Sequence, residues 1–371
     1  MRHTVRDTVR DTVRHTQYAA MKLATYQDGS RDGQLVVVSR DLSQAHHATG
    51  IATRLQDVLD DWNFLAPQLQ DLSVTLNQGR LRHAFNFEPR KCMAPLPRAY
   101  QWVDASAYTH HLELLRRARG QALPDWMATE APMYQGGSDD FLGPCDDACF
   151  ASEDWGIDFE AELAVVTGDV AQGCAPEQAL EGVRLLMLAN DWSLRELIPH
   201  ELAKGMGLIQ GKPSSAFGPV AVTPDELGPA WAGGRVHLAL QSCWNTRQVG
   251  LVEAGAAMGF HFGQLIAQLA KTRRVRAGSV VGSGCVSHPD RRQGVSCIAE
   301  LRALETLDGG TPLTGYLRFG DTLRIEMLGR DGVSVFGAIE QRVLGLDGTG
   351  SPLATQVNDN DTDTNTDTEP G

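Results

Sequence analysis

The sequence has no apolar run long enough to span a bilayer, which takes about 20 consecutive apolar residues in a helix. The body of the chain also has no cluster of Lys and Arg, and 46 acidic against 33 basic residues give a net charge of −13. Proteins that bind nucleic acids present a basic surface. These absences argue against a membrane or nucleic-acid partner.

The seven cysteines form no Cys-x-x-Cys motif, and no secretory hydrophobic segment precedes them. The only close pair, Cys145 and Cys149, has no suitably spaced His or Cys after it, which argues against a zinc site there. We therefore expect reduced thiols and a cytoplasmic location. A Gly-x-Ser-x-Gly motif is also absent, so a serine hydrolase is a poor fit.

Composition divides the 371 residues into four parts. Residues 1–20 contain a four-residue repeat with one apolar position per unit, which predicts a disordered N-terminal extension. Residues 351–371 are predicted to be a disordered acidic tail. Between them we expect a small N-terminal α/β domain over residues 21–95 and a larger domain over 96–350.

Periodicity predicts a β-rich α+β fold rather than a repeating βαβ pattern. Helices are expected over residues 53–78, with Pro67 separating two segments, and over 106–119, 176–185 and 254–271. Strands are expected at 22–26, 34–39, 279–281, 316–319, 322–327 and 334–339.

Residues 158–166 form the most informative stretch, because acidic and apolar residues alternate up to Leu163. Alternation with period two predicts a strand that places Asp158, Glu160 and Glu162 on one face. Carboxylates in a row repel one another, so they need either solvent or a divalent cation. Taken alone, the strand favours a solvated face.

Four local clusters carry most of the other polar residues that could form a site. They comprise residues 102–113 with Asp104 and His111, the acidic strand, the Asp-Trp-Ser-Leu-Arg segment of 191–195, and the Gly-Lys-Pro segment of 211–213. These clusters, in this order, resemble the fumarylacetoacetate hydrolase family over about residues 96–345.

The resemblance implies a β-roll catalytic domain, a homodimer and a site that holds one divalent cation. It implies Asp104, Glu160, Glu162 and Asp191 as metal ligands, with Mg²⁺ as the expected ion and Ca²⁺ or Mn²⁺ as alternatives. Carboxylate ligands are consistent with these hard cations rather than zinc. Asp158 is expected to form a salt bridge or to have a structural role instead.

The resemblance also implies catalytic residues. His111 is expected to act as a base oriented by Glu300, while Arg195 and Lys212 stabilise an oxyanion. Glu113 is a local alternative partner for His111, and both His111 and His110 could instead be ordinary helix-surface histidines. Tyr134, in a Tyr-x-Gly segment, is expected to bind substrate.

Two substrate-contacting positions depart from the family pattern. Ile198 stands where fumarylacetoacetases have a Gln, and Cys285 stands where they have a Thr. The implied reaction is hydrolysis of a carbon–carbon bond in a β-diketo acid, such as fumarylacetoacetate or an acylpyruvate, in aromatic catabolism. A hydratase, decarboxylase or isomerase acting on a 2-oxo acid is the alternative enzyme, and a non-catalytic cation- or acid-binding protein is the alternative outside catalysis.

Overall fold

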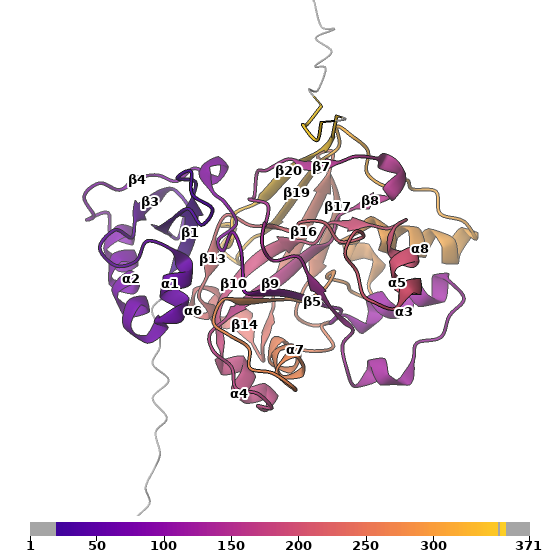
Figure 1. Cartoon of the computed structure of the whole chain (residues 1–371), viewed down its shortest axis with the longest axis horizontal. Helices are drawn as coiled ribbons and strands as arrows, with labels where there is room; N and C mark the ends of the chain where they lie inside the picture. Colours follow the sequence, from indigo (N-terminus) through magenta and orange to yellow (C-terminus); the bar gives the residue numbers. More distant parts are fainter. Residues whose placement is uncertain (1–19, 348, 354–371) are drawn as a thin grey trace, which may run out of the picture.

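The computed structural model describes residues 20–347 and 349–353, so the expected disorder of residues 1–19 and 354–371 lies outside the described residues. Two main sheets and several helices form the molecule (Figure 1). No helix in the described part of the chain combines the length and apolar character that crossing a membrane requires. The expected β-rich α+β class is confirmed.

The larger sheet has 11 strands and runs from the N-terminal region into the centre of the molecule. In order across the sheet these are β4 (Phe85–Asn86), β3 (Gln44–His47), β2 (Gln34–Val38), β1 (Lys22–Tyr26), β13 (Ala221–Val222), β10 (Val183–Asn190), β9 (Ala161–Thr167), β18 (Ser279–Gly282), β5 (Gln101–Ala105) and β6 (Met133–Gly136), with β12 (Ala216–Phe217) beside β10. Because β1 pairs with β13, the sheet continues across the expected boundary between the two domains.

The second sheet has five strands, β17 (Arg247–Glu253), β16 (Ala239–Trp244), β19 (Thr322–Met327), β20 (Ile339–Gly345) and β7 (Ala148–Phe150). Two-stranded ribbons join β8 (Ile157–Asp158) to β11 (Ser193–Leu194) and β14 (Trp231–Ala232) to β15 (Arg235–Val236). The helices are α1 (Leu55–Asp60), α2 (Trp62–Asn77), α3 (Thr109–Ala118), α4 (Pro176–Glu181), α5 (Ile198–Lys204), α6 (Pro224–Leu227), α7 (Phe262–Leu269) and α8 (Ile298–Gly309).

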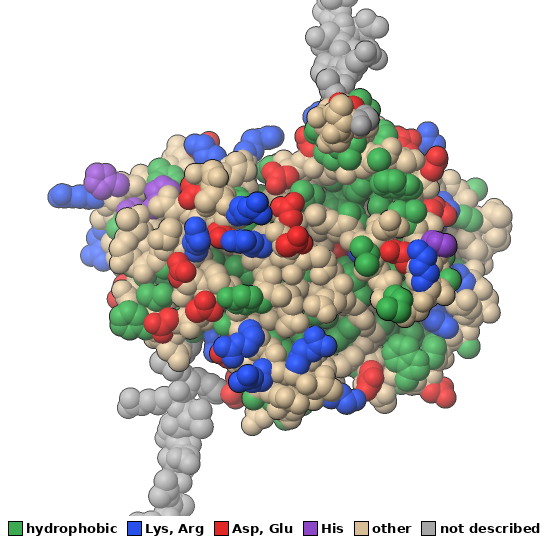
Figure 2. Space-filling model, viewed as in Figure 1, with side chains coloured by type: hydrophobic (Ala, Val, Ile, Leu, Met, Phe, Trp, Pro, Cys, Tyr) green, Lys and Arg blue, Asp and Glu red, His purple; other side chains and the backbone are tan. Residues whose placement is uncertain are grey.

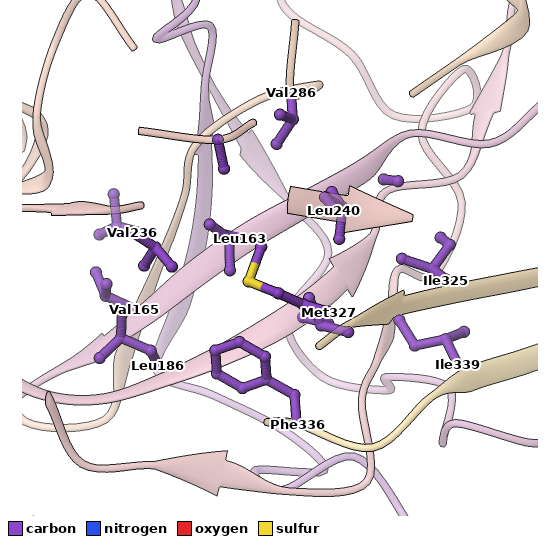
Figure 3. Close-up of a cluster of buried hydrophobic side chains, with 14 of the residues drawn as sticks. Leu163, Val165, Leu186, Val236, Leu240, Val286, Ile325, Met327, Phe336 and Ile339 are labelled. Atoms are coloured by element: carbon purple, nitrogen blue, oxygen red, sulfur yellow. The ribbon is translucent and has the colours of Figure 1, made fainter. Parts of the chain in front are cut away.

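Both faces of the large sheet are buried at β9. On one face, Leu163 and Val165 of β9 meet residues of the second sheet such as Leu240 and Met327 (Figure 3). On the other face, Ala164 and Val166 belong to a second core that includes residues of α1 and α2. A strand covered on both sides leaves no solvated face for its acidic residues.

Four sequence expectations need correction. The break in the N-terminal helical region falls at Asp61, and Pro67 lies inside α2, whose buried Trp62, Ala66 and Leu69 face the core. The helix expected from residue 254 begins only at Phe262. The strand expected over 334–339 instead begins at Ile339, and residues 316–319 contribute only an isolated bridge through Leu317.

Candidate active site

Four carboxylates meet where neighbouring strands of the large sheet end. Asp104 lies in β5 and Glu162 in β9, while Glu160 precedes β9 and Asp191 directly follows β10. One ligand atom from each of these residues lies within 4.8 Å of all the others, and all four side chains are buried. The four predicted metal ligands are therefore brought together.

The alternation around β9 explains part of this arrangement. Phe159, Ala161 and Leu163 face the core between the sheets, as the pattern predicts, and Glu162 lies on the opposite face. That face is not solvated, since Glu162 is completely buried. The preference for a solvated face, drawn from the strand alone, is therefore wrong.

Gly282 makes room for Asp104. It is the register partner of Asp104 in β5 and of Ala164 in β9, and a Cβ atom added there would lie 2.4 Å from Asp104 Oδ1. The Gly284 N–H donates to the same oxygen at 3.0 Å. Burial, followed by the nearby Asp191, raises the pKa of Asp104 to about 8.

Glu162 is the least satisfied of the four acids. Both carboxylate oxygens are buried and have no hydrogen-bond partner among the described residues. Burial and the proximity of Asp104 and Asp191 raise its pKa well above the usual value. A buried carboxylate without a partner costs several kcal/mol, so this side chain points to a positive charge that would bind here.

Asp191 is held by three donors. Ser215 Oγ donates to Oδ1 at 2.6 Å, while Tyr134 OH and Lys212 Nζ each lie 2.6 Å from Oδ2. The Lys212 ammonium also lies 5.2 Å from the centre of the Tyr134 ring. Burial and the Asp191 charge raise the pKa of Tyr134, which keeps this phenol a donor.

Two cations compensate part of the negative charge. Glu160 accepts from Arg195 Nη2 at 2.5 Å and from Lys212 Nζ at 2.7 Å. Although burial acts to raise the pKa of Glu160, these two cations lower it to about 2. Arg195 Nε also donates to Asp158 at 2.8 Å.

Asp158 binds the start of a helix rather than the carboxylate cluster. Its two oxygens accept the backbone N–H groups of Ile298 and Ala299, in the first turn of α8, at 2.7 and 2.9 Å. An anion at a helix N-terminus is favourable because the first N–H groups lack partners within the helix. This geometry agrees with the expected structural role of Asp158.

When all four carboxylates are ionised, they carry more negative charge than the cations that contact them. Arg195 and Lys212 supply two positive charges, and Arg195 is shared with Asp158. A divalent cation would offset the excess charge that protonation otherwise reduces, as the raised pKa values of Asp104 and Glu162 indicate. Since all the ligands offer oxygen, they fit Mg²⁺, Ca²⁺ or Mn²⁺.

The predicted base and its partner are also in contact. His111 Nδ1 lies 2.8 Å from Glu300 Oε2, joining α3 to α8 across 189 residues of sequence. Ser287 Oγ donates to the other Glu300 oxygen at 2.9 Å. His111 also lies near enough to Glu160 to lower the pKa of that carboxyl. The local alternative Glu113 is exposed, whereas Glu300 is buried.

The expected substrate-contacting residues each lie beside a residue of this arrangement. Tyr134 contacts Asp191, as described above. Ile198 begins α5 and packs against Gly211, beside Lys212. Cys285 is buried near His111, Glu300 and Cys297.

Sequence reasoning missed three supporting residues: Ser215, Ser287 and Glu201. Glu201 in α5 accepts the N–H groups of Ile209, Gln210 and Gly211, which fixes the backbone just before Lys212. Ser215 could have been noticed, because it is in the same polar segment as Lys212. Nothing local to Ser287 or Glu201 distinguishes them from ordinary polar residues.

Comparisons with known proteins agree with this fold. A fumarylacetoacetate hydrolase C-terminal domain model matches residues 101–344, and a fumarylacetoacetase N-terminal domain 2 model matches 21–98. The chain belongs to the fumarylacetoacetate hydrolase family, whose enzymes include hydrolases and isomerases. A comparison with curated proteins finds no match.

Solved structures show the same fold. A fumarylacetoacetate hydrolase from Exiguobacterium antarcticum is 18% identical, with a TM-score of 0.58 over 87% of this chain and 99% of that one. A maleylpyruvate hydrolase from Sphingobium sp. SYK-6, in complex with manganese(II) and pyruvate, is 14% identical, with a TM-score of 0.57 over 88% and 99%. A 5-carboxymethyl-2-hydroxymuconate delta-isomerase from Mycobacterium smegmatis is 14% identical, with a TM-score of 0.55 over 88% and 100%.

Proposed function

We propose that this protein is a divalent-cation-dependent hydrolase that cleaves a carbon–carbon bond in a β-diketo acid such as fumarylacetoacetate or an acylpyruvate. The observation that carries the proposal is the His111–Glu300 pair beside the four-carboxylate cluster. A protein that only binds a cation or an acid needs the carboxylates but not a buried histidine oriented by a carboxylate. The pair therefore supports a reaction in which a proton is moved.

In this proposal Asp104, Glu160, Glu162 and Asp191 hold the cation, with Mg²⁺ as our expectation. A cation bound there would supply Lewis acidity toward the oxygens of a β-dicarbonyl substrate. We also propose a homodimer and a cytoplasmic location. The seven cysteines are all free thiols, which is compatible with that location.

His111 would accept a proton from water, with Glu300 holding the ring in position. The resulting hydroxide forms a carbon–oxygen bond to the distal carbonyl, and the carbon–carbon bond then breaks. The electron pair left on the departing carbon takes up the proton from His111. In this scheme water is consumed, two acids are formed and the base returns to its starting state.

Lys212 and Arg195 would stabilise the negative charge that develops on the attacked carbonyl oxygen, since both are charged donors in a water-poor site. Tyr134 would orient the substrate. Ile198 cannot donate a hydrogen bond, so the oxyanion depends on the two cations and backbone N–H groups. We expect Ile198→Gln to be tolerated and to raise activity on fumarylacetoacetate.

The test is a panel of fumarylacetoacetate, maleylpyruvate and simple acylpyruvates, followed by ultraviolet absorbance with added Mg²⁺ or Mn²⁺. The products are then identified from a reaction in ¹⁸O-labelled water. Hydrolysis places one solvent oxygen in a newly formed carboxylate. Carbon dioxide release in place of cleavage next to the distal carbonyl would reject the hydrolase and favour a decarboxylase. Hydration or double-bond migration with no carbon–carbon cleavage would likewise reject it and favour a hydratase or an isomerase.

A further inference from the structure

A second group of potential metal ligands lies beside the carboxylate cluster and has a different chemical character. It consists of Cys285, Cys297, His111 and Glu300, each of which offers one ligand atom within 4.8 Å of the other three. All four side chains are buried. The proposed reaction uses His111 and Glu300 but gives no role to the two thiols together.

The fold assembles this group from three separate segments. Cys285 follows Gly284 in the turn after β18, and Cys297 directly precedes α8. Glu300 lies in the first turn of α8, three residues after Cys297, and His111 comes from α3, which packs against α8. The four side chains are therefore supported by rigid elements.

The ligand set selects a particular kind of cation. Two sulfurs, an imidazole nitrogen and a carboxylate oxygen are typical zinc ligands, whereas the neighbouring cluster offers oxygen alone. Around a tetrahedral zinc, ligand atoms lie roughly 3.3–3.8 Å apart, as follows from bond lengths of about 2.0–2.3 Å. Atoms already within 4.8 Å reach that geometry through small side-chain movements.

We propose that Cys285, Cys297, His111 and Glu300 form a binding site for Zn²⁺, and that zinc bound there inhibits the enzyme. Coordination would occupy the imidazole and carboxylate that are needed to activate water. The inhibition rests on the function proposed above, whereas zinc binding itself does not. Burial raises the pKa of both thiols in the metal-free protein. A bound zinc ion, together with the nearby Arg195, would offset the charge of the two thiolates.

The edge formed by Cys285 and His111 is the side from which zinc would enter. Cys285 and His111 keep 4% and 7% of their surface exposed, while Cys297 has none. His111 and Cys285 both lie near Glu160, so this edge of the group borders the carboxylate cluster. A metal that enters the active site would therefore meet the thiol of Cys285 and the imidazole of His111 first.

The test uses the full chain, freed of metal, fully reduced and saturated with Mg²⁺ so that the oxygen site is filled. Co²⁺ serves as the spectroscopic probe, because it accepts zinc-like sites and gives charge-transfer absorption only when thiolates bind it. We expect about one equivalent of Co²⁺ to produce this absorption and Zn²⁺ to remove it. A Cys285→Ser/Cys297→Ser variant should lose the absorption.

The matched control is Cys145→Ser/Cys149→Ser, which removes the two cysteines that are closest in sequence and should leave the absorption unchanged. The thermal transition shows whether the Cys285/Cys297 double variant folds. If it does not, Cys285→Ser alone is used; this variant should have weaker absorption and at least tenfold lower affinity for Co²⁺. In turnover assays, each protein is compared with its own zinc-free rate. Zinc should inhibit wild type and the control at concentrations at least tenfold lower than those needed for the Cys285 variants.

Absence of thiolate absorption in the wild-type protein would overturn the proposal, as would its persistence after both Cys285 and Cys297 are replaced. A thiolate-bound Co²⁺ in a protein that hydrolyses none of the diketo acids would keep the zinc site and reject only the hydrolase. Hydrolysis with no Co²⁺–thiolate absorption would keep the hydrolase and reject the zinc site. The two proposals therefore fail separately.

Discussion

Replacing Glu162 with Gln tests the charge balance of the carboxylate cluster directly. The substitution keeps the shape of the side chain and removes one negative charge from a position where both oxygens have no partner among the described residues. It should stabilise the metal-free protein and weaken metal binding. A gain in the stability of the metal-free protein together with a loss of metal affinity distinguishes a metal ligand from an ordinary buried acid.

The pH dependence of the wild-type protein follows from the same charges. Burial and Asp191 raise the pKa of Asp104 from 3.8 to about 8, and the pKa of Glu162 is also raised. The folded protein then binds more protons than the unfolded chain, so its stability falls as pH rises from about 4 to 8. For Asp104 alone, the full shift corresponds to on the order of 5 kcal/mol, or a melting temperature change on the order of 10 °C.

Thermal unfolding of chelated protein between pH 5 and pH 8, with and without Mg²⁺ or Mn²⁺, measures these effects. We expect the wild-type melting temperature to fall with pH only in the metal-free form, because a bound cation stabilises the ionised carboxylates. Glu162→Gln should reduce both this slope and the stabilisation by metal. Glu113→Gln, the same change at an exposed position, should shift stability by no more than about 0.5 kcal/mol. A metal-free wild type whose stability rises with pH would refute the reasoning, as would Glu162→Gln with unchanged metal affinity.

Three further substitutions separate the parts of the site. His111→Ala should lower turnover roughly 10²–10⁴-fold while elemental analysis still finds the metal; near-normal turnover would mean that water is activated elsewhere. Lys212→Met should cost on the order of a hundredfold in turnover, and an unchanged rate would remove this residue from the oxyanion site. Gly282→Ala places a methyl group 2.4 Å from Asp104 Oδ1 and should destabilise the protein by about 1–3 kcal/mol and weaken metal binding. Gly137→Ala is its control, because the added atom meets only Asp139, at 3.9 Å, and equal effects of the two changes would contradict the steric argument.

Local pattern alone predicted several elements of the fold. Strands β1, β2 and β19 lie within a residue of their expected bounds, because each combines β-forming residues with turn residues at its ends. The expected break at Pro67 is wrong, although proline usually interrupts a helix. In α2 the packing of one apolar face against the sheet maintains the helix despite the lost N–H donor.

The candidate site could be predicted only in part from the chain itself. Alternation correctly placed Glu162 opposite Leu163, but whether that face is wet or covered depends on α1, α2 and distant strands. The pairing of His111 with Glu300 spans 189 residues, and only the family resemblance suggested it. No local spacing relates Cys285 to Cys297, so the sequence does not predict that the two thiols lie together near this pair.

Lys212 connects the charge balance to the proposed reaction. Its ammonium lies 2.7 Å from Glu160 Oε2 and 2.6 Å from Asp191 Oδ2, oxygens that also belong to two predicted metal ligands. A divalent cation held by these ligands would therefore draw on two carboxylates that also bind this ammonium. Such a cation would weaken the attraction of the two acids for Lys212 and leave its donors free for a developing oxyanion. It follows that Lys212→Met should tighten metal binding while it lowers turnover. The loss of a purely structural ion pair would not produce these two opposite effects.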